Sequence, residues 1–316
     1  MTEKCLYCYM PLAPGEKDFH ATCSRKIFGQ PLPPNLSFSE EQLESLAAEV
    51  IKTHSSITGV QPKLSLELAR GEDKTTKRFT IVGLWGGYIL KPQTLNYPHL
   101  PEVEDLTMHL ASLAKIKVVP HSLIRLQSGN LAYITQRIDR FKKEKLAMED
   151  MCQLTERLTE DKYRGSYEQI AKAIQKYSAT PGLDLVNFFE VLLFSFLTGN
   201  ADMHLKNFSL IRQPGLGMVL SGAYDLVATA LVNLKDDEDM ALTLNGKKKK
   251  IKRSDFIAAF NTVKLDVKQQ DNIFRKMENS KTQWMNLIDK SFLNDEYKAS
   301  YKAMVDSRFL RLSPGD

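Results

Sequence analysis

Apolar and polar residues alternate along several short segments in the first half of the chain, and a period of two is typical of β-strands. These segments are residues 63–68, 78–82, 88–91, 122–126 and 131–138. Between them, Val103, Leu106 and Leu110 recur at helical spacing and predict one inserted helix over residues 102–114. The pattern therefore predicts a β-rich lobe over residues 30–136.

From about residue 140 the apolar period changes to that of helices. The clearest predicted helices are 167–177 and 183–197, and the trend continues over 255–264, 267–279 and 282–309. Two short β-like segments, 208–212 and 218–220, lie on either side of a Pro-Gly turn. The sequence thus predicts an α+β chain of two lobes, with a β-rich first lobe and an all-helical second lobe over residues 137–316.

Residues 1–29 precede both lobes and contain three of the four cysteines. Cys5 and Cys8 form one Cys-x2-Cys pair, and His20 and Cys23 form a His-x2-Cys pair. Two such pairs are the ligand set of a structural Zn²⁺, with no position left for water. A segment of this length buries too little apolar area to fold alone, so a metal ion would explain its order. The alternative is three unpaired cysteines that pack against the β-rich lobe.

Charge is concentrated rather than spread along the chain. The net charge is +5, and Lys247 to Lys250, Lys252 and Arg253 supply six positive charges. Without them the rest of the chain carries about −1, so it lacks the broad basic surface that nucleic-acid binding requires. We interpret the run as a solvated turn before a helix capped by Ser254; a contact for an acidic partner or for DNA in a larger complex is the alternative.

Hydrophobic residues make up 43% of the 316 residues and charged residues 26%, as in an ordinary globular protein. No apolar run is long enough to cross a bilayer, and no apolar stretch behind the first charges indicates a signal peptide. We therefore expect a cytoplasmic protein without membrane contact. Disulfides are rare in that compartment, so Cys152 is expected to be a packed thiol.

Three polar residues in the second lobe suit phosphoryl transfer, which needs a group to position the attacking hydroxyl and others to hold metal ions. Asp202 and Asn207 are five residues apart and follow the predicted helix 183–197. The same offset separates the aspartate and the metal-binding asparagine of protein-kinase catalytic loops. Asp225 follows the β-like pair and could hold a second ion. The alternative is structural: Asp202 and Asn207 stabilise a turn, and His204 is a buried histidine.

The β-rich lobe offers a cation for a phosphate chain. Lys91 stands at the end of a predicted strand, and a carboxylate of the following helix could hold it in place. Glu104 lies beside the apolar face of that helix and is our choice, with Glu102 as the alternative; a solvated surface lysine is the structural interpretation. A loop with the single glycine Gly59 precedes the first strand, and it is not a Walker loop.

These motifs together resemble the HipA family of bacterial serine/threonine kinases, the toxin halves of toxin–antitoxin systems. The match is collinear from about Ser56 to the C-terminus. The similar segments are Ser56-Ile57-Thr58-Gly59-Val60-Gln61-Pro62-Lys63, Ile89-Leu90-Lys91-Pro92, Gln136-Arg137-Ile138-Asp139-Arg140, Gly199 to Asn207, and Tyr224-Asp225. The resemblance implies a two-lobed protein-kinase-like fold that uses ATP and Mg²⁺.

The resemblance also implies a role for each matched position. Asp202 would be the catalytic aspartate, and Asn207 and Asp225 would bind Mg²⁺. The ATP-binding positions would be Thr58, Gly59, Val60, Gln61, Lys63, Lys91, Gln136, Ile138, His204 and Lys206. Ser56 matches the serine that the family autophosphorylates, with Thr58 as a second candidate hydroxyl. A phosphate there would add nearly two negative charges beside the triphosphate site and switch the kinase off.

Only 55 residues precede Ser56, fewer than in HipA proper, and this resembles the HipT branch, in which a small companion protein replaces a missing subdomain. The family's implied partners are a helix-turn-helix antitoxin, through which DNA is met indirectly, and an aminoacyl-tRNA synthetase as the phosphorylated target. Two other functions remain open. One is a small-molecule or lipid kinase of the aminoglycoside or phosphoinositide type, and the other is a non-catalytic co-repressor.

Overall fold

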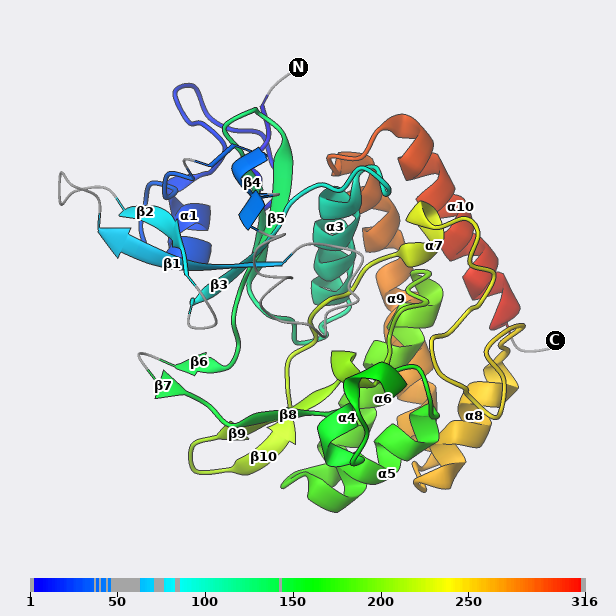
Figure 1. The fold of residues 1–316 in the computed structure, drawn as a ribbon. Coiled ribbons are helices and arrows are strands. Elements are labelled where there is room, and N and C mark those ends of the chain that lie inside the picture. The colour runs from blue at the N-terminus through cyan, green and yellow to red at the C-terminus, as the bar shows by residue number, and fades with distance from the viewer. Residues whose placement is uncertain are drawn as a thin grey trace. The chain divides into compact units, whose positions relative to one another are not determined.

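A computed structural model gives the fold of the chain and describes residues 3–36, 38–39, 41–43, 45–46, 63–70, 77–82, 86–141 and 144–313. The chain divides into two compact units, and each is treated by itself. Unit 1 comprises residues 1–105, 119–137 and 290–292. Unit 2 comprises residues 106–118, 138–289 and 293–316. The predicted α+β class is confirmed, with a curled sheet in unit 1 and a mainly helical unit 2 (Figure 1).

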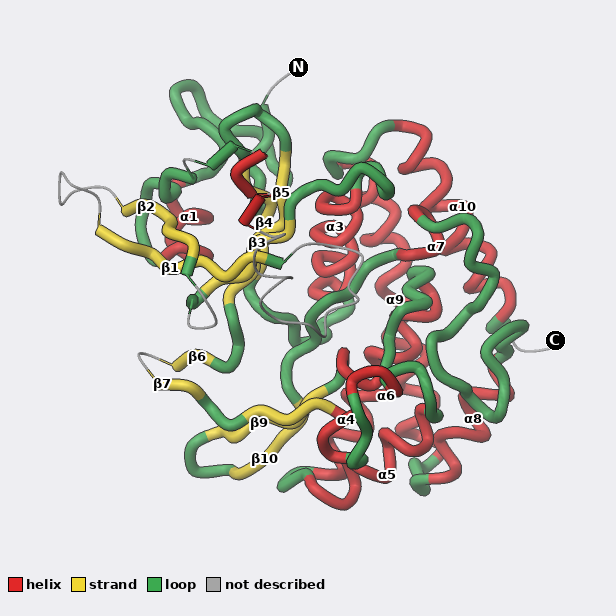
Figure 2. Tube along the Cα trace, in the orientation of Figure 1, coloured by secondary structure: helices red, strands yellow, loops and turns green. Residues whose placement is uncertain are grey.

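Unit 1 is built on a five-stranded antiparallel sheet of order β2-β1-β3-β5-β4 (Figure 2). The strands are β1 (Leu64–Arg70), β2 (Lys77–Ile81), β3 (Tyr88–Lys91), β4 (His121–Arg125) and β5 (Leu131–Gln136). All five predicted strands are present, although β5 ends at Gln136 and not at Ile138. The alternation that predicted them has a direct cause: in β1, Leu64 and Leu66 are buried, whereas the residues that follow each of them, Ser65 and Glu67, are not.

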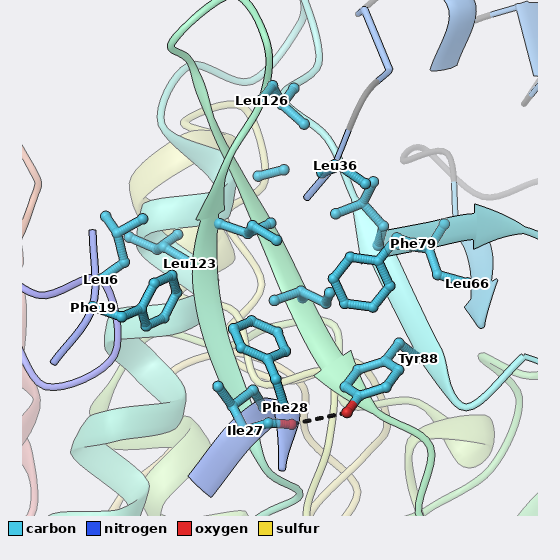
Figure 3. Close-up of a cluster of buried hydrophobic side chains, with 14 of the residues drawn as sticks. Leu6, Phe19, Ile27, Phe28, Leu36, Leu66, Phe79, Tyr88, Leu123 and Leu126 are labelled. Carbon is cyan, nitrogen blue, oxygen red and sulfur yellow. Dashed lines mark hydrogen bonds between the residues drawn. The ribbon is translucent and has the colours of Figure 1, made fainter. Parts of the chain in front are cut away.

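The N-terminal segment shares one hydrophobic core with this sheet. Helix α1 (Ala21–Phe28) buries Ile27 and Phe28, and it ends at Gly29 with φ +70°, a left-handed residue that favours glycine. The ring of Phe28 lies 5.4 Å from Phe19 and 5.8 Å from Phe79, centroid to centroid (Figure 3). The N-terminal segment therefore buries its apolar side chains against the sheet and not in a core of its own.

Helix α3 (Leu100–Leu113) is the helix expected after the third strand. Its residues up to Asp105 belong to unit 1 and the remainder to unit 2. Val103, Leu106 and Leu110, the residues that predicted the helix, are buried, and Met108 on the opposite side is buried too. Glu104 and Asp105 are buried as well, so this helix also carries charged groups into the interior of the protein.

Unit 2 contains most of the helices. They are α4 (Met151–Leu154), α5 (Tyr167–Tyr177), α6 (Pro181–Leu197), α7 (Thr229–Val232), α8 (Arg253–Thr262), α9 (Val267–Lys290) and α10 (Asp295–Arg311). Helix α6 is buried on nearly all sides, and its Phe194 meets Trp284 at a centroid distance of 5.4 Å. The sequence predicts a break between the last two helices at residues 280–281, whereas α9 continues to Lys290. Asn294 sets the start of α10, because its side chain accepts from the backbone N–H of Tyr297 at 2.9 Å.

Unit 2 is not all-helical, which corrects that expectation. The two β-like segments form β9 (Ser209–Gln213) and β10 (Gly217–Leu220), and β8 (Met148–Asp150) adds a third strand. Strands β6 (Arg140–Phe141) and β7 (Glu144–Lys145) form a separate short pair. The turn between β9 and β10 places Gly215 and Gly217 at φ +78° and +104°, so backbone geometry there favours glycine and closes a hairpin.

The basic run lies in the turn before α8 and has acidic neighbours. Lys247 contacts Asp255 at 2.8 Å, and Lys249 contacts Asp237 at 2.5 Å. The expected cap at Ser254 is wrong. The N-cap residue is Lys252, whose backbone N–H donates to Asp255 at 3.0 Å, because the aspartate three positions into the helix reaches back to it.

Across the part of the chain that the structure describes, no helix combines the length and the apolar character that a bilayer crossing needs.

Candidate functional site

The loop that carries Asp202 begins where α6 ends. Gly199 has φ +69°, a left-handed backbone conformation that favours glycine. The backbone N–H of Asn200 donates to the carbonyl of Ser195 at 2.8 Å and closes the helix end. The long buried helix therefore delivers residues 200–207 from a fixed point.

Asn207 holds the loop closed from within. Its Nδ2 donates to the backbone carbonyl of Asp202 at 2.9 Å, and the N–H of His204 donates to the same carbonyl at 2.8 Å. The buried Asn207 ends the 3-10 turn Leu205–Asn207. If Asp202 and Asn207 had only a structural role, they would stabilise the turn through this same contact. It is also compatible with metal binding, because it uses the amide nitrogen and leaves Oδ1 as the oxygen ligand.

The carboxylate of Asp202 accepts a hydrogen bond that the sequence did not reveal. The hydroxyl of Tyr163 donates to Oδ1 of Asp202 at 2.7 Å. Burial, and then the negative charge of Asp202, raise the pKa of Tyr163, so this hydroxyl stays protonated and remains a donor. Tyr163 lies 39 residues before Asp202 in an irregular segment, and no spacing rule connects the two residues.

His204 is a neutral histidine in this loop. It is buried, and burial lowers its pKa, although the nearby charge of Asp202 opposes the shift. Its ring meets that of Tyr163 edge to face at 5.1 Å. Its Nδ1 has no hydrogen-bond partner among the described residues. An uncharged imidazole can still offer one hydrogen bond toward a phosphate, but it does not supply a cation.

Lys206 and Tyr224, the residue before Asp225, both contact the three-stranded sheet of β8, β9 and β10. Lys206 forms an ion pair with Asp150 at 2.6 Å, and Asp150 also caps α4. The hydroxyl of Tyr224 donates to the carbonyl of Lys206 at 3.0 Å and contacts Ser209 at 2.5 Å. The half-buried Asp225 follows with φ +59°, a left-handed backbone that few non-glycine residues adopt and that clusters at functional sites.

In unit 1, Lys91 and Glu104 form a buried ion pair with Nζ and Oε1 2.5 Å apart. The side chains are 4% and 0% exposed, so the interpretation of Lys91 as a solvated surface residue does not hold. Nζ also lies 5.3 Å from the centre of the Tyr133 ring. Oε1 of Glu102, the other candidate, lies instead 3.4 Å from Nδ1 of His99. Strand β3 and helix α3 thus hold the lysine against one chosen carboxylate.

The predicted hinge residues fall at the boundary of the two units. Gln136 ends β5 in unit 1, and its Nε2 donates to the carbonyl of Ile27 at 2.6 Å. Ile138 is half-buried in unit 2. Lys63 is exposed at the start of β1. The remaining predicted phosphate-loop positions lie outside the described residues, and these are Ser56, Thr58, Gly59, Val60 and Gln61.

The four N-terminal Cys and His side chains converge. The ligand atoms of Cys5, Cys8, His20 and Cys23 all lie within 4.8 Å of one another. Nδ1 of His20 is 3.4 Å from the sulfur of Cys8 and 3.7 Å from that of Cys23. Cys152 is buried elsewhere, in α4 of unit 2, as expected of a packed thiol.

Curated relatives share part of this sequence. The chain is 29% identical over 210 residues to a putative kinase of Haemophilus influenzae, a match that covers 62% of this chain and 59% of the relative. It is 32% identical over 208 residues to the putative kinase Y4dM of Sinorhizobium fredii, covering 61% of this chain and 49% of the relative. The matched part of the chain thus spans about half the length of these relatives.

Solved structures share the fold. HipA of Shewanella oneidensis, solved with HipB and operator DNA, matches 84% of this chain and 70% of its own with a TM-score of 0.67 at 22% identity. The kinase CtkA of Helicobacter pylori matches 71% of this chain and 87% of its own with a TM-score of 0.52 at 15% identity. At these identities the likeness establishes the protein-kinase-like fold of HipA. The model of the HipA-like C-terminal domain family matches residues 55–284, which is most of the chain, and the chain therefore belongs to that family.

Proposed function

We propose that the chain is an ATP- and Mg²⁺-dependent serine/threonine protein kinase of the HipT-like branch of this family. The observation that carries the proposal is the buried pair of Lys91 and Glu104. Removing two charges from water is expensive, and a lobe with only a structural task gains little from such a pair. A protein kinase gains a fixed ammonium group for the phosphates of ATP.

The residues of unit 2 supply the complementary groups. Asp202 accepts the proton of the attacking hydroxyl while that oxygen bonds to the γ-phosphorus and the bond to the bridging oxygen of ADP breaks. Asn207 Oδ1 and the Asp225 carboxylate would hold Mg²⁺, which neutralises phosphate charge when bound. The hydrogen bond from Tyr163 orients the Asp202 carboxylate, and its backbone is held by Asn207.

The substrate proposal rests on the family. We infer that the target is a serine in the ATP-site loop of an aminoacyl-tRNA synthetase, and that Ser56, with Thr58 as a second candidate, is autophosphorylated. Partners would be a helix-turn-helix antitoxin, which alone would contact DNA, and a small companion protein. The support for an antitoxin is that the HipA of Shewanella oneidensis was solved with HipB and its operator DNA.

Labelled ATP tests the reaction and its acceptor together. Wild-type chain, an Asp202→Asn variant and a panel of purified aminoacyl-tRNA synthetases are incubated with labelled ATP and Mg²⁺, and phosphopeptides are mapped. We expect label on Ser56 and on one synthetase, both lost in Asp202→Asn. A Ser56→Ala variant should lose the label on the chain itself. Ser55→Ala, a change at the adjacent serine, is the matched control and should keep it.

The same labelling with an aminoglycoside and a phosphoinositide added as acceptors, together with a repression assay, separates the two competing functions. Label found only on an aminoglycoside or a phosphoinositide would make the chain a small-molecule or lipid kinase. No label at all, together with repression by an antitoxin that Lys91→Ala leaves intact, would make it a non-catalytic co-repressor. Either result would overturn the proposal.

A further inference from the structure

The distances from His20 to two of the sulfurs in the N-terminal cluster fit a tetrahedral zinc site. A Zn²⁺ with Zn–S and Zn–N bonds of ordinary length sets sulfur and nitrogen ligands about 3.6 Å apart and two sulfurs about 3.8 Å apart. The Nδ1 of His20 lies 3.4 Å from the sulfur of Cys8 and 3.7 Å from that of Cys23. Each of the four ligand atoms lies within 4.8 Å of the other three.

The residues around the four ligands also favour a metal ion. Nε2 of His20 is 3.0 Å from the carbonyl of Pro11, so a backbone acceptor can fix the ring with Nδ1 toward the sulfurs. Cys5 and Cys23 are buried, so a thiolate at either position needs a positively charged partner. A divalent cation is the partner that would stabilise thiolates here.

We propose that Cys5, Cys8, His20 and Cys23 hold a structural Zn²⁺, and that the zinc-bound segment positions the nucleotide-binding residues of unit 1. The second part rests on the proposed kinase function, whereas the metal site stands without it. Two chains of contacts lead from the cluster to those residues.

The first chain of contacts runs through α1. His20 precedes this eight-residue helix and Cys23 lies in its first turn, so two ligands fix its start. At its other end the carbonyl of Ile27 accepts from the hydroxyl of Tyr88 at 2.9 Å (Figure 3). The same carbonyl accepts from Nε2 of Gln136 at 2.6 Å. Tyr88 and Gln136 are register partners in β3 and β5. One carbonyl therefore anchors the strand of the ATP lysine and the predicted hinge.

The second chain of contacts runs through Tyr9, the residue after Cys8. Its backbone has φ +65°, and its N–H donates to the carbonyl of Cys5 at 2.9 Å, inside the Cys-x2-Cys turn. Its hydroxyl donates to Asp105 at 2.7 Å, and His121 contacts the other oxygen of that carboxylate at 2.7 Å. Asp105 follows Glu104 on α3, so the same loop braces the helix that holds Lys91.

Metal content is the first test. The full-length chain is purified without added metal, and zinc is measured by mass spectrometry; the metal-free chain is then titrated with Co²⁺. We expect roughly one zinc per chain, and the visible absorption of tetrahedral thiolate-bound Co²⁺. His20→Cys keeps four donors and should retain the metal, whereas His20→Ala should lose most of it. Cys152→Ser, a thiol outside the cluster, should change nothing.

Hydrogen exchange is the second test, because it needs no ATP. Removal of zinc from wild type should speed exchange in α1 and β3 and leave α9 of unit 2 unchanged. ATP-analogue affinity should fall roughly 10-fold, because the nucleotide would then have to order residues that the zinc-bound segment holds in place beforehand. Tyr88→Phe and Gln136→Ala should each lower that affinity while zinc content stays at the wild-type level.

The outcomes separate the two claims. A wild-type chain that contains no zinc and shows no Co²⁺ absorption would overturn the metal site. Bound zinc whose removal leaves exchange in β3 and analogue affinity unchanged would overturn the positioning role. A wild type that binds zinc but no ATP would overturn the proposed kinase function, while zinc content and exchange would still decide the metal site. Should His20→Ala fail to fold, chelated wild type and the Tyr88→Phe variant give the same decision.

Discussion

The residues proposed for phosphoryl transfer are held in place in different ways in unit 1 and in unit 2. In unit 1 the cation is buried and already paired, with Lys91 against Glu104 beside the Tyr133 ring. In unit 2 the acid is half-buried, and its carboxylate has a donor in Tyr163 while its backbone is braced by Asn207. A buried charge pair is expensive to disturb, whereas a partly exposed carboxylate can be replaced with little effect on folding.

This difference suits what the residues of each unit are proposed to do. The lysine must meet a phosphate chain in the same place at every turnover, so a rigid pair is an advantage. The aspartate must meet a protein hydroxyl that arrives from solvent, so it has to remain accessible. Substitutions in the two units should therefore separate catalysis from stability, and each of the following predictions tests that separation.

The largest effect is expected from Asp202→Asn. The change removes the proposed proton acceptor, and general-base groups contribute about 10²–10⁴-fold to rate, so phosphate transfer should fall by roughly 10³-fold. The amide still accepts from Tyr163, so the melting temperature should stay close to wild type. Steady-state transfer from labelled ATP measures the first quantity and thermal unfolding the second. Asp161→Asn, at an exposed ion pair with Arg164, is the control.

Lys91→Met should affect stability as well as nucleotide binding. It leaves Glu104 buried without its cation, which costs about 3–5 kcal/mol of unfolding free energy in comparable cases. Urea unfolding measures that loss. The double change Lys91→Met with Glu104→Leu should recover much of the stability and none of the ATP-analogue binding. A double variant that is as unstable as the single one would show that the pair itself holds unit 1 together.

The sequence predicted the five strands of unit 1 and the longer helices of both units, because alternation and helical spacing follow directly from which side chains are buried. It also selected Glu104, since that residue lies beside the apolar stripe of its helix. It did not predict Tyr163, whose contact with Asp202 joins residues 39 positions apart without any periodic pattern. Local rules can also compete: Ser254 was a plausible cap, but Asp255 reaches back to Lys252 and sets the helix start there.

The same reasoning explains the expectation of an all-helical second lobe. Strands β9 and β10 were visible as short apolar runs, but β8 is three residues long and is defined by its pairing of Met148 with Ile211. Pairing partners distant in sequence leave no periodic signal in so short a segment. The N-terminal segment shows the converse: its Cys and His spacing predicted the cluster, whereas its shared core with the sheet came only from the fold.

A smaller effect is expected from Tyr163→Phe. The variant removes the donor to Asp202 and keeps the ring that packs against His204. Since a hydrogen bond to a charged group is worth about 1.5–3 kcal/mol at most, and water can replace it at a half-exposed site, transfer should fall roughly 5-fold. Tyr177→Phe, where the hydroxyl accepts from the exposed Lys176, is the control. A fall as large as that of Asp202→Asn would make Tyr163 part of the chemistry.

The smallest effect concerns pH and His204. Burial lowers its pKa in the folded chain, with Asp202 and Asp225 opposing and Lys162 adding to the shift, while an unfolded histidine titrates near pH 6.5. As pH falls below about 6.5, the unfolded chain takes up this proton before the folded chain does, so unfolding becomes easier until the folded pKa is also passed. Melting temperature measured from pH 7.5 downward should therefore decline less in His204→Gln than in wild type. A His204→Gln curve that follows the wild-type curve would mean that this histidine gains its proton equally well in the folded and the unfolded chain.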